Sequence, residues 1–142
     1  MNETQHICDF IKNNHLLTLC TNSCSDLWCA HCYYIFDSNK MSLFIMTNES
    51  SHHSQLMILN KNIAGTIAPQ PENISDIKGI QFKGHIEKLT NTEAETAKNL
   101  YYNIFCSAKF ISAPIWEIEL TMIKMTDNSL SFGKKLIWHN NA

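Results

Sequence analysis

Short stretches in which apolar and polar residues alternate, separated by polar clusters, recur along most of the chain. Alternation with a period of two is typical of strands, and it slips at Ile123, which indicates a β-bulge. About seven strands are predicted, at residues 15–21, 27–36, 41–47, 62–68 and 79–89, between Pro114 and a turn at 126–129, and at 130–138. Only a few residues connect the first three strands, which favours antiparallel hairpins over parallel βαβ units.

Three other segments have the spacing of amphipathic helices. The first follows Asn2, which can cap it together with Gln5, the second spans 51–60, and the third opens with a capping box at 92–95. The residues expected to face inward are Ile7, Phe10 and Ile11 in the first helix, Leu56 and Leu59 in the second, and Ala97, Leu100, Tyr101, Ile104 and Phe105 in the third. This pattern predicts a mainly β protein of the α+β class, with a barrel-like sheet and a few peripheral helices.

Composition limits the size and class of the protein. With 142 residues, 44% of them hydrophobic, the chain is long enough for one domain, which we place at 1–142. The 11 Lys and Arg against 13 Asp and Glu give a net charge of −2, so the cationic excess typical of nucleic-acid binding is missing and no nucleic-acid partner is expected. Only 17% of the residues are charged, which leaves apolar surface for a second copy and favours a homodimer.

The N-terminal sequence and the cysteines predict a cellular location. No basic and apolar leader and no apolar stretch of membrane-spanning length is present, so we expect a cytoplasmic protein without membrane contact. Six cysteines in such a protein are expected to be free thiols.

One group of cysteines has a possible ligand spacing. The group consists of Cys24, Cys29, His31 and Cys32, in which Cys29-x-x-Cys32 has the spacing of a zinc site. However, residues 29 and 32 fall on opposite faces of a strand because the side-chain period is two. Structural thiols are therefore favoured over metal binding or redox use, and no metal site is predicted.

The sequence contains no glycine-rich dinucleotide or phosphate loop and no nucleophile elbow. A phosphate site would therefore have to use a helix N-terminus and side chains. The segment from Thr47 to His53 offers one, because it runs from a strand end into a helix start. It carries the hydroxyl of Ser51 as N-cap and the imidazoles of His52 and His53. The alternative interpretation is an ordinary capped helix with surface histidines.

Two weaker features add candidate residues. Gln81 is an amide on the polar face of strand 79–89, and Lys134 and Lys135 are neighbouring cations near the C-terminus. Side chains of these types are common on solvated surfaces, so neither feature alone indicates a site.

Longer stretches of the sequence resemble a known family. They are residues 27–30 (LWCA), 79–84 (GIQFKG), 112–118 (SAPIWEI), 126–130 (TDNSL) and 132–135 (FGKK), together with Trp138. On these stretches the chain resembles the pyridoxamine 5′-phosphate oxidase-like FMN-binding split barrels and, along nearly its whole length, their YhbP-like branch. The resemblance implies a six-stranded split β-barrel with Greek-key connections, and a homodimer with two cofactor sites at the subunit interface.

The resemblance also implies where FMN is held. The strand that ends at Thr47 lines the flavin, the helix start holds the phosphate, and Gln81 meets the edge of the isoalloxazine ring. C-terminal residues of the second subunit complete the pocket. The cofactor-binding residues expected on this basis are Thr47, Ser51, His52, His53, Gln81, Lys134 and Trp138. Flavin-binding oxidases of this group carry Arg and Lys where this chain has His52 and His53. Three alternatives follow: the partner's Lys134 or the partner's Lys135 supplies the missing charge, FMN binds weakly, or the site takes another ligand.

The expected function is that of an FMN-dependent oxidoreductase acting on a small molecule. The flavin supplies the redox chemistry in such proteins, so no catalytic residue needs to be recognisable in the sequence. The alternative is a non-enzymatic split-barrel module that binds or senses flavin or haem. A third hypothesis is a zinc or redox-thiol protein built on Cys24, Cys29 and Cys32.

Overall fold

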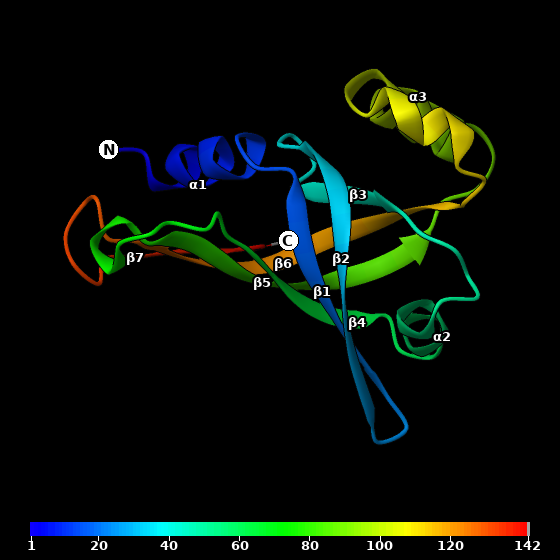
Figure 1. The fold of residues 1–142 in the computed structure, drawn as a ribbon, viewed down its shortest axis with the longest axis horizontal. Helices are drawn as coiled ribbons and strands as arrows, with labels where there is room; N and C mark the ends of the chain where they lie inside the picture. Colours follow the sequence, from blue (N-terminus) through cyan, green and yellow to red (C-terminus); the bar gives the residue numbers. More distant parts are fainter. Residues whose placement is uncertain (142) are drawn as a thin grey trace.

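The computed structural model describes residues 1–141, which form seven β-strands and three α-helices (Figure 1). The strands are β1 (Leu16–Ser23), β2 (Asp26–Asp37), β3 (Ser42–Met46), β4 (Asn62–Ile67), β5 (Lys78–Lys88), β6 (Ile115–Asp127) and β7 (Lys135–His139). The helices are α1 (Glu3–Lys12), α2 (His52–Leu59) and α3 (Asn91–Ile104), with two short 3-10 helices, η1 (Ile74–Asp76) and η2 (Cys106–Phe110). The predicted mainly β architecture with peripheral helices is confirmed.

Six of the strands close into a barrel because β3 pairs with both β2 and β6. The strand order is β3-β2-β1-β4-β5-β6, and every neighbouring pair is antiparallel. Since β4 lies beside β1 and not beside β3, the first four strands form a Greek key. The seventh strand, β7, pairs with the C-terminal half of β6, beyond the segment that pairs with β3. The expected six-stranded split barrel is therefore confirmed, with β7 as an added strand.

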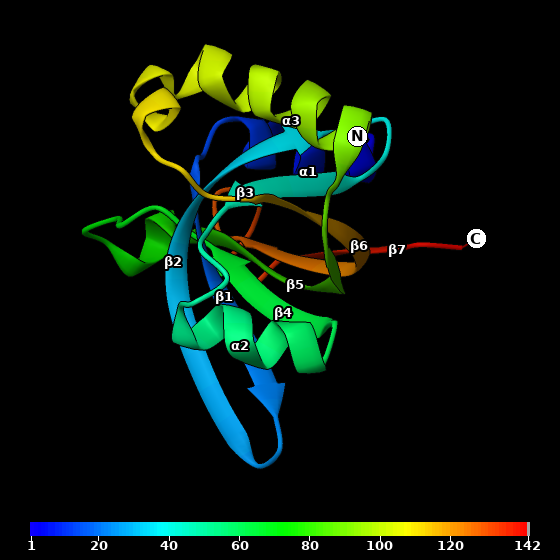
Figure 2. The same ribbon diagram turned by 90° about the vertical axis from the view of Figure 1, so that its right-hand side faces the viewer.

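The alternating side chains of the strands fill the barrel and make the main core. Ile7 and Ile11 of α1 and Met57 of α2 belong to the same buried cluster, so these two helices pack against the barrel interior. Helix α3 lies outside the barrel, where Ala97 and Tyr101 belong to a second, smaller cluster. Figure 2 shows α2 and α3 on opposite sides of the sheet. Among the described residues, no helix combines the length and the apolar character needed to cross a membrane.

Two local predictions are confirmed by specific contacts. The side chain of Asn2 caps α1, because its Oδ1 accepts a hydrogen bond from the Gln5 backbone N–H at 3.1 Å. The β-bulge lies on β6 close to the predicted slip: Met122 pairs with Lys83 and Leu120 pairs with Gly84, which leaves Thr121 as the extra residue.

Details of the second and third helices differ from prediction. Leu59 is 70% exposed, because the buried side of α2 carries Ser54 and Met57, and a residue two positions after Met57 points away from that side. In α3, the capping box at 92–95 was the wrong start: the helix begins at Asn91. Its contact with the barrel is narrow and is made through Ala97 and Tyr101, so the other predicted inward residues, Leu100 and Ile104, are exposed.

The last strand is shorter than predicted. The segment predicted as a strand over 130–138 is a turn up to Lys134, and β7 begins at Lys135. The turn is held by side chains, since Asp127 accepts hydrogen bonds from the backbone N–H and hydroxyl of Ser129, and Asn128 accepts one from the Gly133 N–H. Gly133 has φ +76°, which glycine adopts without the cost that a side chain would add.

Candidate functional site

Three of the predicted phosphate residues form one hydrogen-bonded cluster between β3 and α2. Thr47 directly follows β3, where its carbonyl accepts a hydrogen bond from the indole N–H of Trp116 at 3.0 Å. The Thr47 hydroxyl lies 2.7 Å from Nε2 of His53, and the Ser51 hydroxyl lies 3.2 Å from the same nitrogen. The structure therefore brings together Thr47, Ser51 and His53, three of the residues proposed from the sequence.

The start of α2 keeps backbone N–H groups available to a ligand. Ser51 occupies the N-cap position, but its side chain makes no capping hydrogen bond to the helix backbone. Its hydroxyl lies instead 2.8 Å from the Asn48 carbonyl and 2.7 Å from the Ser54 hydroxyl. The N–H groups of a first helical turn have no partner within the helix and carry the positive end of the helix dipole. This arrangement suits an anion such as a phosphate.

The cluster contains little fixed positive charge. Burial, and secondarily the neighbouring His52, hold the pKa of His53 below its usual value, which favours the neutral imidazole. The chain has no arginine. A nearby cation is Lys88 at the end of β5, whose Nζ lies 2.8 Å from the carboxylate of Glu49 in the loop before α2. Sequence reasoning missed Lys88, because the strand pairing that brings it to this loop leaves no local signal.

His52 lies in a different environment from His53. Its Nε2 is 2.9 Å from Oδ2 of Asp26, at the start of β2. Its ring contacts the ring of Trp28 edge to face, with centroids 4.9 Å apart. The two histidines that were predicted together thus diverge: His53 joins the hydroxyl cluster, and His52 ties α2 to the β1–β2 hairpin.

Gln81 lies in a groove on the outer face of the barrel. It is exposed on β5 and opposes Thr66 of β4 and Lys124 of β6. The groove has a volume of about 350 Å³ and is lined by Cys20, Ala64, Gly65, Thr66, Gln81, Phe82, Lys83, Met122 and Lys124. Gln81 and Lys88 are seven residues apart on β5, which is roughly 23 Å at the usual rise of a strand. Gln81 is therefore remote from the end of β5 that carries Lys88.

The two C-terminal candidates are also remote from α2. Lys134 is exposed in the turn before β7. That turn lies at the opposite end of the molecule from α2 in Figure 1. Trp138 opposes Ile123 on β6 and packs, half-buried, against the core of its own barrel. One chain does not bring either residue to the Thr47–Ser51–His53 cluster.

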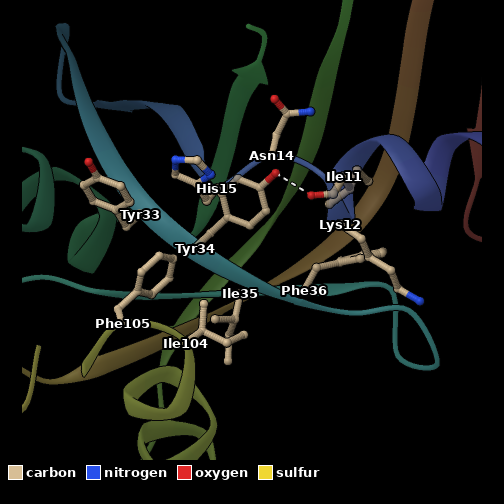
Figure 3. A pocket seen from close by; sticks show the side chains of 10 residues that line it. All are labelled: Ile11, Lys12, Asn14, His15, Tyr33, Tyr34, Ile35, Phe36, Ile104 and Phe105. Carbon is tan, nitrogen blue, oxygen red and sulfur yellow. Dashed lines mark hydrogen bonds between the residues drawn. The ribbon is translucent and has the colours of Figure 1, made fainter. Parts of the chain in front are cut away.

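A further cleft was not predicted from the sequence. It has a volume of about 450 Å³ and lies between the end of α1, the outer face of β2 and the segment that follows α3 (Figure 3). The rings of His15 and Tyr33 are stacked with centroids 5.8 Å apart, and Phe105 meets Tyr33 at 5.4 Å. The Tyr34 hydroxyl donates to the Ile11 carbonyl at 2.7 Å, which holds this wall in place. No sequence motif marks the cleft, because its aromatic residues come from segments far apart in the chain.

The residues of the predicted thiol cluster do not converge. Cys29 is exposed on the outer face of β2, whereas Cys32 is buried in the barrel core. In the part of the chain that the structure describes, no group of three or more His, Cys, Asp or Glu side chains is arranged to hold a metal ion. The zinc hypothesis therefore has no support in the geometry.

Comparison with solved structures places the barrel in a known fold. The chain is similar to a heme binding protein from Mycobacterium smegmatis, with a TM-score of 0.79 and 13% identity over 96% of this chain and 56% of that chain. It is also similar to an FAD-binding protein from Mesorhizobium loti, with a TM-score of 0.71 and 9% identity over 85% of this chain and 91% of that one. At such identities the likeness shows the fold alone. The predicted resemblance to pyridoxamine 5′-phosphate oxidase-like split barrels is confirmed.

Comparison with curated sequences identifies closer relatives. No protein-family model matches the sequence. A UPF0306 protein of Yersinia pestis is 49% identical over 129 residues, which cover 91% of this chain and 88% of the relative. Identity at this level over nearly the full length of both chains establishes common membership, and the chain belongs to the UPF0306 family.

Proposed function

We propose that this protein is a homodimeric, cytoplasmic FMN-binding flavoprotein of the oxidoreductase type that acts on a small molecule. The observation that carries the proposal is the cluster of Thr47, Ser51 and His53 at a helix start without a side-chain cap. Hydroxyls, an imidazole and first-turn N–H groups are the donors that a phosphate requires. The FAD-binding neighbour of the same fold supports a flavin as the ligand that carries this phosphate.

The proposed site residues of the chain have separate roles. The α2 start binds the phosphate, and the amide of Gln81 hydrogen-bonds the polar edge of the isoalloxazine ring. Bound FMN supplies hydride or electron transfer, while the protein binds and orients it. The groove around Gln81 is lined mainly by apolar groups, which suits the faces of a flat ring.

The proposed dimer follows from the separation of these parts. On one chain, Lys134 and Trp138 lie away from the α2 cluster, so a second copy has to bring these two residues to each site. The sites also lack arginine, and a cation from a second copy would strengthen the attraction for a phosphate dianion. The partner's Lys134 and the partner's Trp138 are the residues proposed for this role.

A titration with FMN and riboflavin tests the proposal. The fluorescence of FMN should be quenched or shifted when it binds, with a dissociation constant in the micromolar range. His53→Ala should weaken FMN binding about tenfold, the effect of one hydrogen bond of roughly 1.4 kcal/mol. The same substitution should leave riboflavin binding unchanged, because riboflavin carries no phosphate.

The control variant is His85→Ala, since His85 is exposed on β5 and opposes Asn62 and Glu119, which are not residues of the cluster. It should bind FMN like the original protein. Failure to bind FMN, or equal losses for FMN and riboflavin in His53→Ala, would refute the phosphate site. A monomer by sedimentation in the presence of FMN would refute the dimer.

The second candidate function is a non-enzymatic module that binds or senses haem or another flat ring. The cleft between α1, β2 and the segment that follows α3 favours it, because His15, Tyr33 and Phe105 present aromatic surfaces and an imidazole in one place. Adding haemin should then produce a Soret band that is lost in Tyr33→Ala and retained in His53→Ala. An unchanged haemin spectrum on mixing would exclude this alternative.

A further inference from the structure

Cys20 and Cys29 face each other across the β1–β2 hairpin. They are direct partners in the antiparallel register, and their sulfur atoms lie 3.4 Å apart. The other four described cysteines are placed differently: Cys8 contacts Met41, Cys24 contacts Ser23 in the hairpin turn, Cys32 is buried in the core, and Cys106 is exposed at the start of η2.

The backbone geometry at this pair suits a disulfide. Residues directly opposite in an antiparallel pair have Cα atoms about 4.5–5.5 Å apart, within the range of about 4.4–6.8 Å found for disulfides. Side-chain rotation alone can therefore bring the two sulfur atoms to bonding distance. The hairpin does not need to open or shift its register.

We propose that Cys20 and Cys29 are a redox-active pair that forms a reversible disulfide on reaction with a hydroperoxide. With hydrogen peroxide, the Cys29 sulfur attacks one peroxide oxygen and the O–O bond breaks. A sulfenic acid forms at Cys29, and the other oxygen leaves with the Cys29 thiol proton as water. The Cys20 sulfur then attacks the sulfenic sulfur, forming the S–S bond, and the sulfenic oxygen leaves with the Cys20 proton as the second water. Two thiols lose two electrons, and one hydrogen peroxide becomes two waters.

The surroundings of the two thiols decide their order in the reaction. Cys29 is exposed and open to peroxide, whereas Cys20 is partly covered. Burial, together with the hydrogen bond from Cys29, raises the pKa of Cys20 to about 11. Cys20 therefore stays protonated at neutral pH and is a poor nucleophile toward peroxide. This assigns the attack on peroxide to Cys29 and the later attack on the sulfenic acid to Cys20.

The pair also lies beside the groove proposed to bind the flavin ring. Cys20 lines the groove that contains Gln81, so forming the disulfide draws the Cys20 sulfur toward β2 and alters that wall. The redox reaction itself depends only on the hairpin, and it holds whether or not the groove binds a flavin.

The test is a thiol count after treatment of the whole protein with a small excess of hydrogen peroxide. Under denaturing conditions, the oxidised protein should have lost two of its six titratable thiols, and dithiothreitol should restore both. Cys24→Ser is the matched control, because it removes a nearby exposed cysteine from the same hairpin, and it should still lose two thiols. Cys20→Ser and Cys29→Ser should lose no thiols to disulfide formation. Their circular dichroism spectra should match that of the original protein, which shows that both variants fold.

Peptide mapping provides a measurement that does not depend on the serine variants at the pair. In oxidised Cys24→Ser, cleavage before Asp26 separates Cys20 from Cys29, and the two fragments should remain joined until reduction. No loss of thiols at this dose, fragments that stay joined in Cys29→Ser, or a loss of two thiols that persists in Cys20→Ser would overturn the proposal.

Discussion

Replacing Asp127 by alanine should lower the free energy of unfolding by about 2–4 kcal/mol, the expected cost of losing a buried carboxylate with several hydrogen bonds. The Asp127 side chain is completely buried at the end of β6. It accepts hydrogen bonds from the Ser129 N–H at 2.9 Å and the Ser129 hydroxyl at 2.6 Å, and its other oxygen lies 2.7 Å from Nε2 of His6. One side chain thus holds the turn before β7 and anchors α1 to the barrel.

The effect of Asp127→Ala should depend on pH. Burial raises the pKa of Asp127, but the hydrogen bonds from Ser129 and His6 outweigh burial, and the net pKa lies below its ordinary value. The stability that this carboxylate contributes is therefore present above about pH 4 and is lost as the pH falls through the lower pKa of the folded state. Urea unfolding should show the largest difference in the free energy of unfolding between the original protein and Asp127→Ala near neutral pH. That difference should shrink below about pH 4.

Asp37→Ala is the matched control for this prediction. Asp37 also ends a strand and accepts hydrogen bonds from two backbone N–H groups, those of Asn39 and Lys40. It is only half-buried, and those two hydrogen bonds stay within its own turn. Its replacement should cost about 1 kcal/mol or less. Equal losses for the two variants would show that the contact with His6 and the burial of Asp127 add nothing.

Replacing Gly65 by alanine should lower the free energy of unfolding by about 1–3 kcal/mol, the usual cost of overfilling a packed interior. Gly65 is buried on β4 between β1 and β5. A methyl group there would collide with the carbonyl oxygen of Thr18 and with the ring of Phe82, which occupies the space next to the glycine. The Phe82 ring is buried in the core, and the Thr18 carbonyl is strand backbone, so neither can move freely.

Gly79→Ala provides the comparison for this second variant. Gly79 also lies in a strand, but a methyl group there would be 3.3 Å from Cβ of Ala68 and 3.4 Å from the Ile67 carbonyl oxygen. These contacts need only small shifts, so the expected change is within about 0.5 kcal/mol. If the urea midpoint falls equally in the two variants, the close packing of Phe82 on Gly65 is not the reason that a side chain at position 65 lowers stability.

Most elements of the fold were predictable from local patterns. Alternation along 79–89 and the slip near Ile123 located β5 and the bulged strand β6, and the side chain of Asn2 located the start of α1. The errors occurred where a distant contact overrides the local pattern. Residues 130–134 alternate like a strand, but the side chains before them form a turn: Asp127 accepts hydrogen bonds from Ser129, and Asn128 accepts one from the Gly133 N–H.

The candidate site was predictable only in part. Thr47, Ser51 and His53 lie within seven consecutive positions, so a strand end followed by a helix start was enough to bring them together. His52 occupies the neighbouring position in that segment, and nothing local indicated that Asp26 would bind it. Lys88 and the cleft at Tyr33 were missed because their neighbours come from other strands and helices.

The sequence by itself determined the strands, the helices and the position of the segment proposed to bind an anion, because these follow from the period of the hydrophobic residues and from residue types at helix ends. The tertiary structure alone decided which side chains meet. His6 and Asp127 are 121 positions apart, and Cys20 meets Cys29 only through the register of one hairpin. Such pairs depend on strand register and closure of the barrel, where a shift by one residue would turn every side chain to the other face.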